Sequence, residues 1–483
     1  MQIFDNFIIT SGIEGGLCAL SGFAVLFIAA VINFSLAGLF EKKSQKISNT
    51  ITISALLLSG ILQTPALLAF LNPHSAESLK FFSGILSIGG FETALCIIAE
   101  FCILLAFLIS CGHLKRLRFK QHYFNSLYLC CACALNMLLI SKGFLSFMLS
   151  LEVISVCAFF IILGFKNRGI FFSAYKFLIL SFAASALMIF SYAIYDIFSQ
   201  DSLFVAALAS VLFVSALVFK GGFAFVFERQ GQGRVKYNFP AFVFLNTAVL
   251  FAYCAAFIKV FEGMIILPAL TRVFFIALLC AALPLIALKI PRAKTFYSFI
   301  FSLNSLNWCL TVLALFIGTK NFCIWVLFAL LNTVISSGAL LSAAAIFDIN
   351  KNSNADISEF LGICHTNPLY CKLLSTALFI AAGILPSGVF ALRYYFSLFF
   401  LQTGLWSSVI LVFALAAYMI AIWGVLNFIS TMHKKPHFVK SNCGEKQTIA
   451  GVFKKRTNLN GSILFILIIL SIILYFIPLF IEL

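Results

Sequence analysis

One carboxylate and three cations occupy segments of the chain that are otherwise as apolar as lipid. Glu152, Lys176 and Lys220 lie in three successive apolar runs, and Arg393 lies in a run closer to the C-terminus. A charged side chain at mid-bilayer depth costs about 3 kcal/mol on insertion scales, so such residues are few and usually face one another or a water-filled path. A Glu and a Lys on neighbouring runs therefore indicate a proton or ion site.

Each of these side chains also has a purely structural interpretation. Glu152 is too short to reach an interface, but it can equally be a carboxylate that hydrogen-bonds a neighbouring helix. Lys176 and Lys220 lie nearer the ends of their runs, where a long stem can carry the ammonium group toward the interface. Arg393 precedes two tyrosines that would suit an interfacial aromatic belt. The residue types leave both interpretations open.

The pairing of Glu152 with Lys220 would supply the chemistry of proton movement. In a low dielectric, a carboxylate and an ammonium group keep each other charged, and separating them disfavours the charge on each. An event that opens the pair can therefore drive a proton along ionisable residues and water. Glu92 and Glu100 lie on one further run; we expect Glu92 at the interface and Glu100 either at a helix contact or as a second polar point.

Composition places the whole chain in the membrane. The 483 residues are 63% hydrophobic with a mean hydropathy of +1.10, and 10% are charged, against roughly 25% in a soluble domain. No stretch remains for a globular domain that would turn the net charge of +16 into affinity for nucleic acid. The 15 cysteines form no spaced set with histidine, so we expect small apolar residues, no metal site and no cofactor in this chain.

Fourteen apolar runs are long enough to cross a bilayer, which takes roughly 20 residues per helix. The start of the chain lacks the basic region of a cleaved signal peptide, so we expect the first run to be retained. The runs lie near 17–40, 51–71, 85–111, 124–141, 143–164, 171–195, 203–226, 239–262, 268–289, 296–317, 322–347, 369–398, 405–430 and 462–481.

Basic residues between the runs predict the topology. Twenty-three lysines and arginines fall in alternate loops, against five on the other side, and this bias marks the first set as cytoplasmic. Both termini then lie on the periplasmic side of the inner membrane. The five opposing residues are Lys80, Lys142, Lys259, Arg272 and Lys320, and the four inside runs are Lys176, Lys220, Lys372 and Arg393.

The order of the runs predicts two inverted five-helix repeats. Runs four to eight and nine to thirteen form two sets of five. Because five is an odd number of crossings, the second set begins on the opposite side of the membrane from the first. Glycine or proline interrupts corresponding runs at 220–222 and 383–388, so we expect helices 7 and 12 to be discontinuous. The predicted parts are 1–111, 112–262 and 263–430, then 431–483, which holds a basic cytoplasmic loop and the last helix.

Four short motifs carry a family resemblance by their order. Residues 151–155 read Leu-Glu-Val-Ile-Ser, residues 174–185 contain Tyr-Lys-Phe before a small-residue run, residues 218–220 read Val-Phe-Lys, and residues 382–386 read Ala-Gly-Ile-Leu-Pro. Over roughly 85–430 the chain resembles the antiporter-like membrane subunits of respiratory complex I, most closely the N subunit of bacterial NADH-quinone oxidoreductase.

The resemblance assigns roles to the buried charges. It implies that Glu152 is the fifth-helix carboxylate paired with Lys220, that Lys176 is an auxiliary lysine, and that Arg393 replaces a twelfth-helix lysine near the outward exit. The eighth-helix relay lysine falls at Leu250 in this chain, so that group is missing. Guanidinium does not deprotonate in proteins. Either protons cross by waters around Asn246, Ser302 and Asn304, or the subunit transmits a conformational or electrostatic change without pumping fully.

By this resemblance the protein is an all-α, fourteen-span, inner-membrane subunit of a proton-translocating NADH-quinone oxidoreductase. It would couple quinone reduction and electron transport to proton movement while holding no redox group. Its partners would be membrane lipid and other membrane-arm subunits, including sister antiporter-like subunits. A free-standing cation/proton antiporter or a hydrogenase-type membrane subunit of the same fold is the alternative. A lipid or polysaccharide flippase fits less well, because it needs a wide cationic cavity.

Overall fold

The computed structural model is almost entirely helical. It describes residues 2–39, 44–71, 79–81, 84–113, 121–164, 168–198, 203–226, 239–260, 269–315, 322–348, 356–402, 405–434 and 458–481. The described chain forms two compact units, Met1–Phe227 with Pro240–Arg272, and Glu228–Phe239 with Val273–Leu483. The boundary falls close to the expected junction of the two five-helix sets, while the inverted repeat and the four-part division stay predictions.

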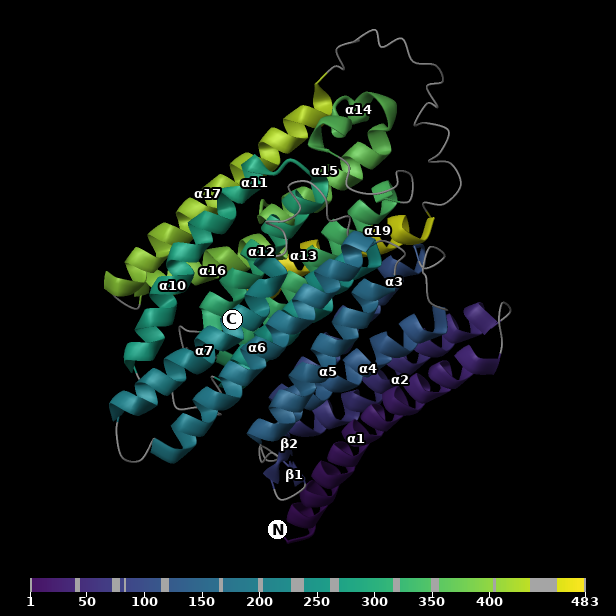
Figure 1. Cartoon of the computed structure of the whole chain (residues 1–483), viewed down its shortest axis with the longest axis vertical. Coiled ribbons are helices and arrows are strands. Elements are labelled where there is room, and N and C mark those ends of the chain that lie inside the picture. The colour runs from purple at the N-terminus through teal and green to yellow at the C-terminus, as the bar shows by residue number, and fades with distance from the viewer. Residues whose placement is uncertain are drawn as a thin grey trace. The chain divides into compact units, whose positions relative to one another are not determined.

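Long apolar helices build the first unit (Figure 1). Helix α1 packs against α2 and α4, α2 against α3, and α6 against α7. In lipid every backbone polar group must be satisfied within the chain, so these apolar runs can cross only as helices. The elements are α1 Gln2–Leu39, α2 Ser44–Leu71, β1 Leu79–Phe81, β2 Leu86–Ile88, α3 Gly90–Cys111, α4 Gln121–Ile140, α5 Phe144–Leu163, α6 Arg168–Phe198, α7 Leu203–Val226, α8 Phe239–Phe244, a π-helix Leu245–Val249 and α9 Leu250–Lys259.

The second unit contains a broken helix among continuous ones. Helix α13 packs against α15 and α19, and both α11 and α15 pack against α17. The elements are α10 Ala269–Ala287, α11 Lys289–Arg292, α12 Phe296–Leu315, α13 Phe322–Asp348, a 3₁₀ turn Ile357–Phe360, α14 Ile363–Thr366, α15 Pro368–Ala382, α16 Gly388–Gln402, α17 Leu405–His433 and α19 Asn458–Ile481.

The expected spans agree with the helices. In the described chain, thirteen helices are long and apolar enough to cross a membrane. The remaining expected span, 369–398, is divided between α15 and α16, of fifteen residues each. The fourteen predicted crossings therefore correspond to thirteen such helices and one broken helix, and the protein is a multi-pass, all-α membrane protein. The antiparallel hairpin of β1 and β2 was not predicted.

The expected break in helix 7 is wrong. Helix α7 continues without interruption through Lys220, Gly221 and Gly222. A glycine pair permits a break but does not impose one, and an unbroken helix keeps every backbone bond inside the segment. Gly221 serves close packing instead, because a Cβ there would lie 3.1 Å from Cγ of Tyr253 on α9.

Two other crossings carry the irregular backbone. The expected break in helix 12 is present: α15 ends before Gly383, which has φ of 69°, and α16 begins at Gly388. The crossing Phe239–Lys259 contains the π-helix Leu245–Val249, which has no glycine or proline of its own and was not predicted. Single π-turns occur frequently at functional sites, and this one directly precedes the expected lysine position.

Candidate functional site

Glu152, Ser185 and Lys220 form a closed polar triangle in the first unit. Lys220 Nζ lies 2.5 Å from Glu152 Oε1 and also donates to Ser185 Oγ. The Ser185 hydroxyl donates to the same Glu152 oxygen. The Lys220 side chain is 0% exposed and that of Glu152 is 26% exposed. An enclosed ammonium group with a carboxylate this close is a charge pair with little water to replace either partner.

Helices α5, α6 and α7 position the triangle. Glu152 on α5 and Ser185 on α6 come from the two motifs singled out in the sequence, and Lys220 comes from the third. Glu152 Oε2 is buried, and no described residue donates a hydrogen bond to it. One carboxylate oxygen is therefore committed to the triangle, and the other remains available as a proton acceptor.

Hydroxyl groups continue from the triangle toward α9. The single Ser185 hydroxyl proton has a second acceptor within reach, the Ser181 backbone carbonyl 3.0 Å away, and Ser181 Oγ donates to Ser155 Oγ at 3.0 Å. The Tyr253 side chain hydrogen-bonds Ser155 in turn. The link between Ser185 and Ser181 goes through a backbone carbonyl, which only accepts, so these bonds tie α5 to α6 without forming a continuous row of hydroxyls. Sequence reasoning missed Tyr253, which has no motif around it.

The other two expected positions in this unit lie apart from the pair. Lys176 on α6 is half-buried, and no hydrogen bond or ion pair joins it to another described residue. Its auxiliary role stays a prediction. Leu250 is 3% exposed and is the first residue of α9, one helical turn before Tyr253. The position of the missing lysine is thus apolar, with a phenol one turn away.

Arg393 in the second unit is held by three groups, one of which is itself anchored to α15. Its Nη2 donates to Asn307 Oδ1 at 2.9 Å, and its Nη1 donates to the carbonyl of Ala382, the last residue of α15. The guanidinium carbon lies 4.2 Å from the centroid of the Tyr418 ring. Asn307 Nδ2 donates to the Ala381 carbonyl at 2.9 Å. Arg393 is 7% exposed. Its guanidinium group supplies a donor to a carbonyl at the end of α15, where the helix itself has no donor left.

Gly383 makes this arrangement possible, and an alanine there should disrupt it. A Cβ at Gly383 would lie 2.7 Å from Arg393 Nη1, at a φ of 69° that L-residues rarely adopt. We expect Gly383→Ala to lower the free energy of unfolding by about 1–3 kcal/mol. Thermal unfolding of the purified chain in detergent measures the change.

Substitutions at two other glycines separate backbone strain from the clash with Arg393. Gly84 has φ of 87° with nothing within 4 Å of its Cβ position, so Gly84→Ala reports backbone strain alone. Gly461 in α19 has open space and no positive φ, so Gly461→Ala should leave the stability unchanged or raise it. If Gly383→Ala lowers the free energy of unfolding by no more than Gly84→Ala does, the position of Arg393 does not depend on the absence of a Cβ at residue 383.

Glu100 is a second buried carboxylate, on α3. Ser59 Oγ, Gln63 Nε2 and Asn136 Nδ2 donate to its Oε1 at 2.6, 2.8 and 2.7 Å. These donors come from α2 and α4, so one carboxylate joins three helices. Of the two expectations for Glu100, the helix contact is the one that these bonds support.

Glu92 lies in the first turn of α3, and its expected place at the interface stays a prediction. Its side chain is 10% exposed, and its Oε1 lies 3.5 Å from Lys142 Nζ and 3.9 Å from Lys259 Nζ. The Lys259 side chain is 1% exposed. Topology had placed Lys142 and Lys259 in loops or span ends, where burial cannot be recognised from charge counts. The first unit therefore contains a further buried acid and base.

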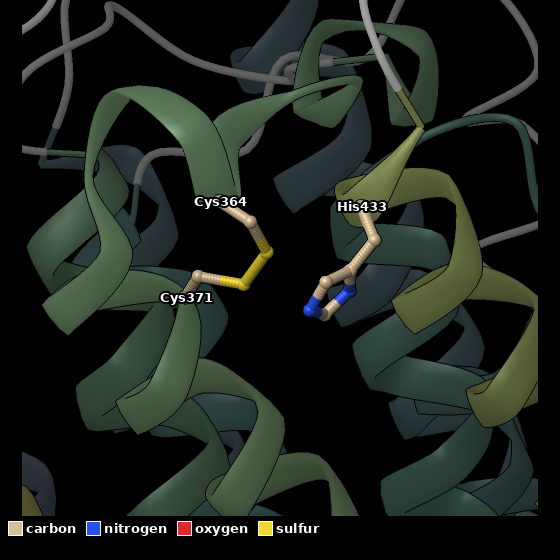
Figure 2. A group of neighbouring side chains, drawn as sticks. All are labelled: Cys364, Cys371 and His433. Atoms are coloured by element: carbon tan, nitrogen blue, oxygen red, sulfur yellow. A yellow bond between two sulfur atoms is a disulfide. The ribbon is translucent and has the colours of Figure 1, made fainter.

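The expectation that the cysteines are only small apolar residues is wrong for two of them. Cys364 and Cys371 form a disulfide, and His433 lies beside it (Figure 2). The sequence spacing hid the group, because His433 comes from another helix 62 residues after Cys371.

The described helices form the fold of a polytopic, all-α membrane protein that contains buried charge pairs. No family model matches the sequence, and no curated protein matches it. Among solved structures, a chain of respiratory complex I from Thermus thermophilus with bound aureothin has a TM-score of 0.73 and 17% sequence identity, covering 95% of this chain and 97% of that chain.

Two further complexes contain chains of the same fold. A chain of the membrane-bound sulfane sulfur reductase, an archaeal respiratory membrane complex, has a TM-score of 0.76 and 16% identity, covering 95% of this chain and 94% of that chain. A chain of the Mrp complex from Dietzia sp. DQ12-45-1b has a TM-score of 0.76 and 11% identity, covering 96% and 95%. These likenesses support the fold that the sequence motifs indicated.

Proposed function

We propose that the protein is the N-type membrane-arm subunit of a proton-translocating NADH-quinone oxidoreductase in the cell inner membrane, with both termini periplasmic. The observation that carries this proposal is the ammonium group of Lys220, fully enclosed and 2.5 Å from Glu152. A structural helix contact needs no charge, and charges inside a membrane usually mark an ion or proton route. The chain would contribute no redox group of its own.

The triangle supplies the step that this chain would perform. When the carboxylate moves away, the enclosed ammonium group loses the interaction that stabilises its charge. It then gives up its proton, and the carboxylate, separated from the cation, accepts one more readily. The Ser185 hydroxyl accepts from Lys220 and donates to Glu152, so it can pass the proton between the two charged groups by exchanging these bonds.

Arg393 would have a different role. A guanidinium stays charged in proteins, so Arg393 cannot receive and release the proton. We infer that it acts as a fixed cation that repels a proton or biases its exit, held in place by Asn307, Ala382 and Tyr418.

The alternative is a membrane subunit of an Mrp-type antiporter or of another respiratory complex. The Mrp and sulfane sulfur reductase chains have TM-scores of 0.76, no lower than the 0.73 of the complex I chain. A buried Glu/Lys pair serves all these assignments equally, so the partners of the chain must distinguish them.

Purification from native membranes in mild detergent, followed by mass spectrometry of the co-migrating proteins, tests the assignment. We expect sister antiporter-like subunits and the peripheral NADH-oxidising or quinone-reducing subunits in one complex. Recovery of the chain in an assembly that lacks redox subunits and exchanges Na⁺ for H⁺ would exclude the oxidoreductase. Recovery with hydrogenase or sulfur-reducing subunits would assign it to the other respiratory class.

A further inference from the structure

Three metal-ligating side chains meet at one end of the second unit (Figure 2). Cys364 lies in α14, Cys371 lies in α15, and His433 is the last residue of α17. The two Sγ atoms and a ring nitrogen of His433 all lie within 4.8 Å of one another. Cys371 is buried, whereas His433 is exposed, so the group can be reached from solution.

The imidazole of His433 is oriented as a ligand. Its Nδ1 lies 2.9 Å from the backbone carbonyl of Ile429, one turn earlier in α17. A carbonyl can only accept, so Nδ1 carries the proton of this bond. In the neutral ring the other nitrogen, Nε2, then has the free lone pair. Metal-bound histidines usually make this kind of second bond, which fixes the tautomer and the ring orientation.

A second histidine holds the two sides of the group together. The ring of His365, which follows Cys364, has its Nε2 3.2 Å from the backbone carbonyl of His433. This bond joins the short α14 turn to the end of α17. His365 is therefore a positioning residue that keeps Cys364 near the His433 ring.

The basic residues near this group predict a reducing compartment, in which a permanent disulfide is unfavourable. The basic stretch that follows α17 is the most strongly basic loop of the sequence and is predicted to be cytoplasmic. Cytoplasmic thiols keep most cysteines reduced. Two glutathione-type thiols would supply two electrons and two protons: the Cys364–Cys371 bond breaks, two S–H groups form, and the two reductant sulfurs join as a disulfide.

We propose that the reduced Cys364 and Cys371, together with His433, form a binding site for Zn²⁺. Two thiolates and an imidazole are ligands that Zn²⁺ prefers, with metal–ligand distances of about 2.3 and 2.0 Å, so tetrahedral ligand atoms lie about 4 Å apart. Binding displaces the two thiol protons. Three protein ligands leave the fourth position to water or a small anion.

Metal binding would change which helices are joined. The disulfide joins only α14 and α15, which are close in sequence. The zinc-bound form would also hold α17 through His433. Helices α15 and α17 carry Ala382 and Tyr418, which both contact Arg393, so the site would fix the two helices that hold that cation. This inference is independent of the proposed redox complex.

Cobalt and zinc titration of the full-length chain tests the proposal. The chain is purified in detergent, reduced with a phosphine and titrated anaerobically with Co²⁺. We expect a single tetrahedral Co²⁺ per chain, with thiolate-to-cobalt absorption that added Zn²⁺ abolishes. The Cys364→Ser/Cys371→Ser double variant should show no such absorption, and His433→Ala should bind at least about tenfold more weakly.

The matched control is Cys18→Ser, which removes a part-exposed cysteine of the first unit and should leave the titration unchanged. Helix content by circular dichroism shows whether each variant is folded. Cobalt absorption that persists in the double variant, or a reduced parent chain without it, overturns the proposal. So does acid-quenched thiol trapping in cells that finds Cys364 and Cys371 fully oxidised, because the pair would then be a permanent disulfide.

Discussion

Glu152→Gln and Lys220→Met should each destabilise the chain and lower proton translocation, whereas the double variant should recover stability alone. Removing one partner of a buried pair costs about 3–5 kcal/mol, because the remaining charge is stranded. The Lys220 side chain is 0% exposed and that of Glu152 is 26% exposed. Glu152→Gln therefore strands the more enclosed charge and should be the more damaging single change.

The double variant separates structure from function. Glu152→Gln/Lys220→Met removes both charges at nearly constant volume, and neutral replacement of a whole buried pair is often neutral or stabilising. The stability should return to within about 1 kcal/mol of the parent chain, since no charge is stranded. Unfolding of all four chains in detergent completes a double-mutant cycle, and additive losses would show that the two residues are not coupled.

Lys372→Met is the matched control for the lysine change. Lys372 is another cation within a predicted span, but its side chain is exposed. Its replacement should change stability by no more than about 0.5 kcal/mol. A loss as large as that of Lys220→Met would show that any intraspan lysine behaves in this way, and the pair would lose its special status.

Arg393→Met should have the second large effect. The change leaves Ala382 O and Asn307 Oδ1 without their donor and removes the cation from the Tyr418 ring. Each buried acceptor left unsatisfied costs about 1–3 kcal/mol, so we expect a loss of about 2–5 kcal/mol in unfolding free energy. Thermal and denaturant unfolding in detergent measure it.

Lysine at this position distinguishes charge from geometry. Arg393→Lys keeps the cation but has a single ammonium group in place of the fork, so it should recover only part of the stability. Arg292→Met removes an exposed arginine of the same unit and should have almost no effect. Full stability in Arg393→Met would contradict the view that the guanidinium completes the end of α15.

Local sequence signals predicted most of the fold. Because a membrane helix must satisfy its own backbone, apolar length alone located the crossings, and residues 383–388 correctly marked the interrupted one. The same reasoning failed at Gly221, where the missing side chain makes room for the Tyr253 ring rather than for a turn. A glycine in one sequence does not reveal which of these two uses it has.

Site residues could be predicted where a charge stands alone in an apolar run. They could not be predicted where the packing of distant helices brings them together. Glu152 and Lys220 stood out because no loop accounts for them, and their pairing agrees with the geometry. Lys259 was hidden, since a lysine at a span end ordinarily reaches water, and its burial depends on α3 supplying Glu92. His433 and Cys371 are far apart in sequence, so only the packing of α17 against α14 and α15 brings them together.

The number of protons moved per electron tests the central claim most directly. The complex that contains the Glu152→Gln/Lys220→Met chain is reconstituted in vesicles, and proton uptake is measured beside NADH oxidation, with Lys372→Met as the control. The account predicts an assembled complex with parent-like chain stability and a lower proton-to-electron ratio. An unchanged ratio would show that the pair is structural and would contradict the account.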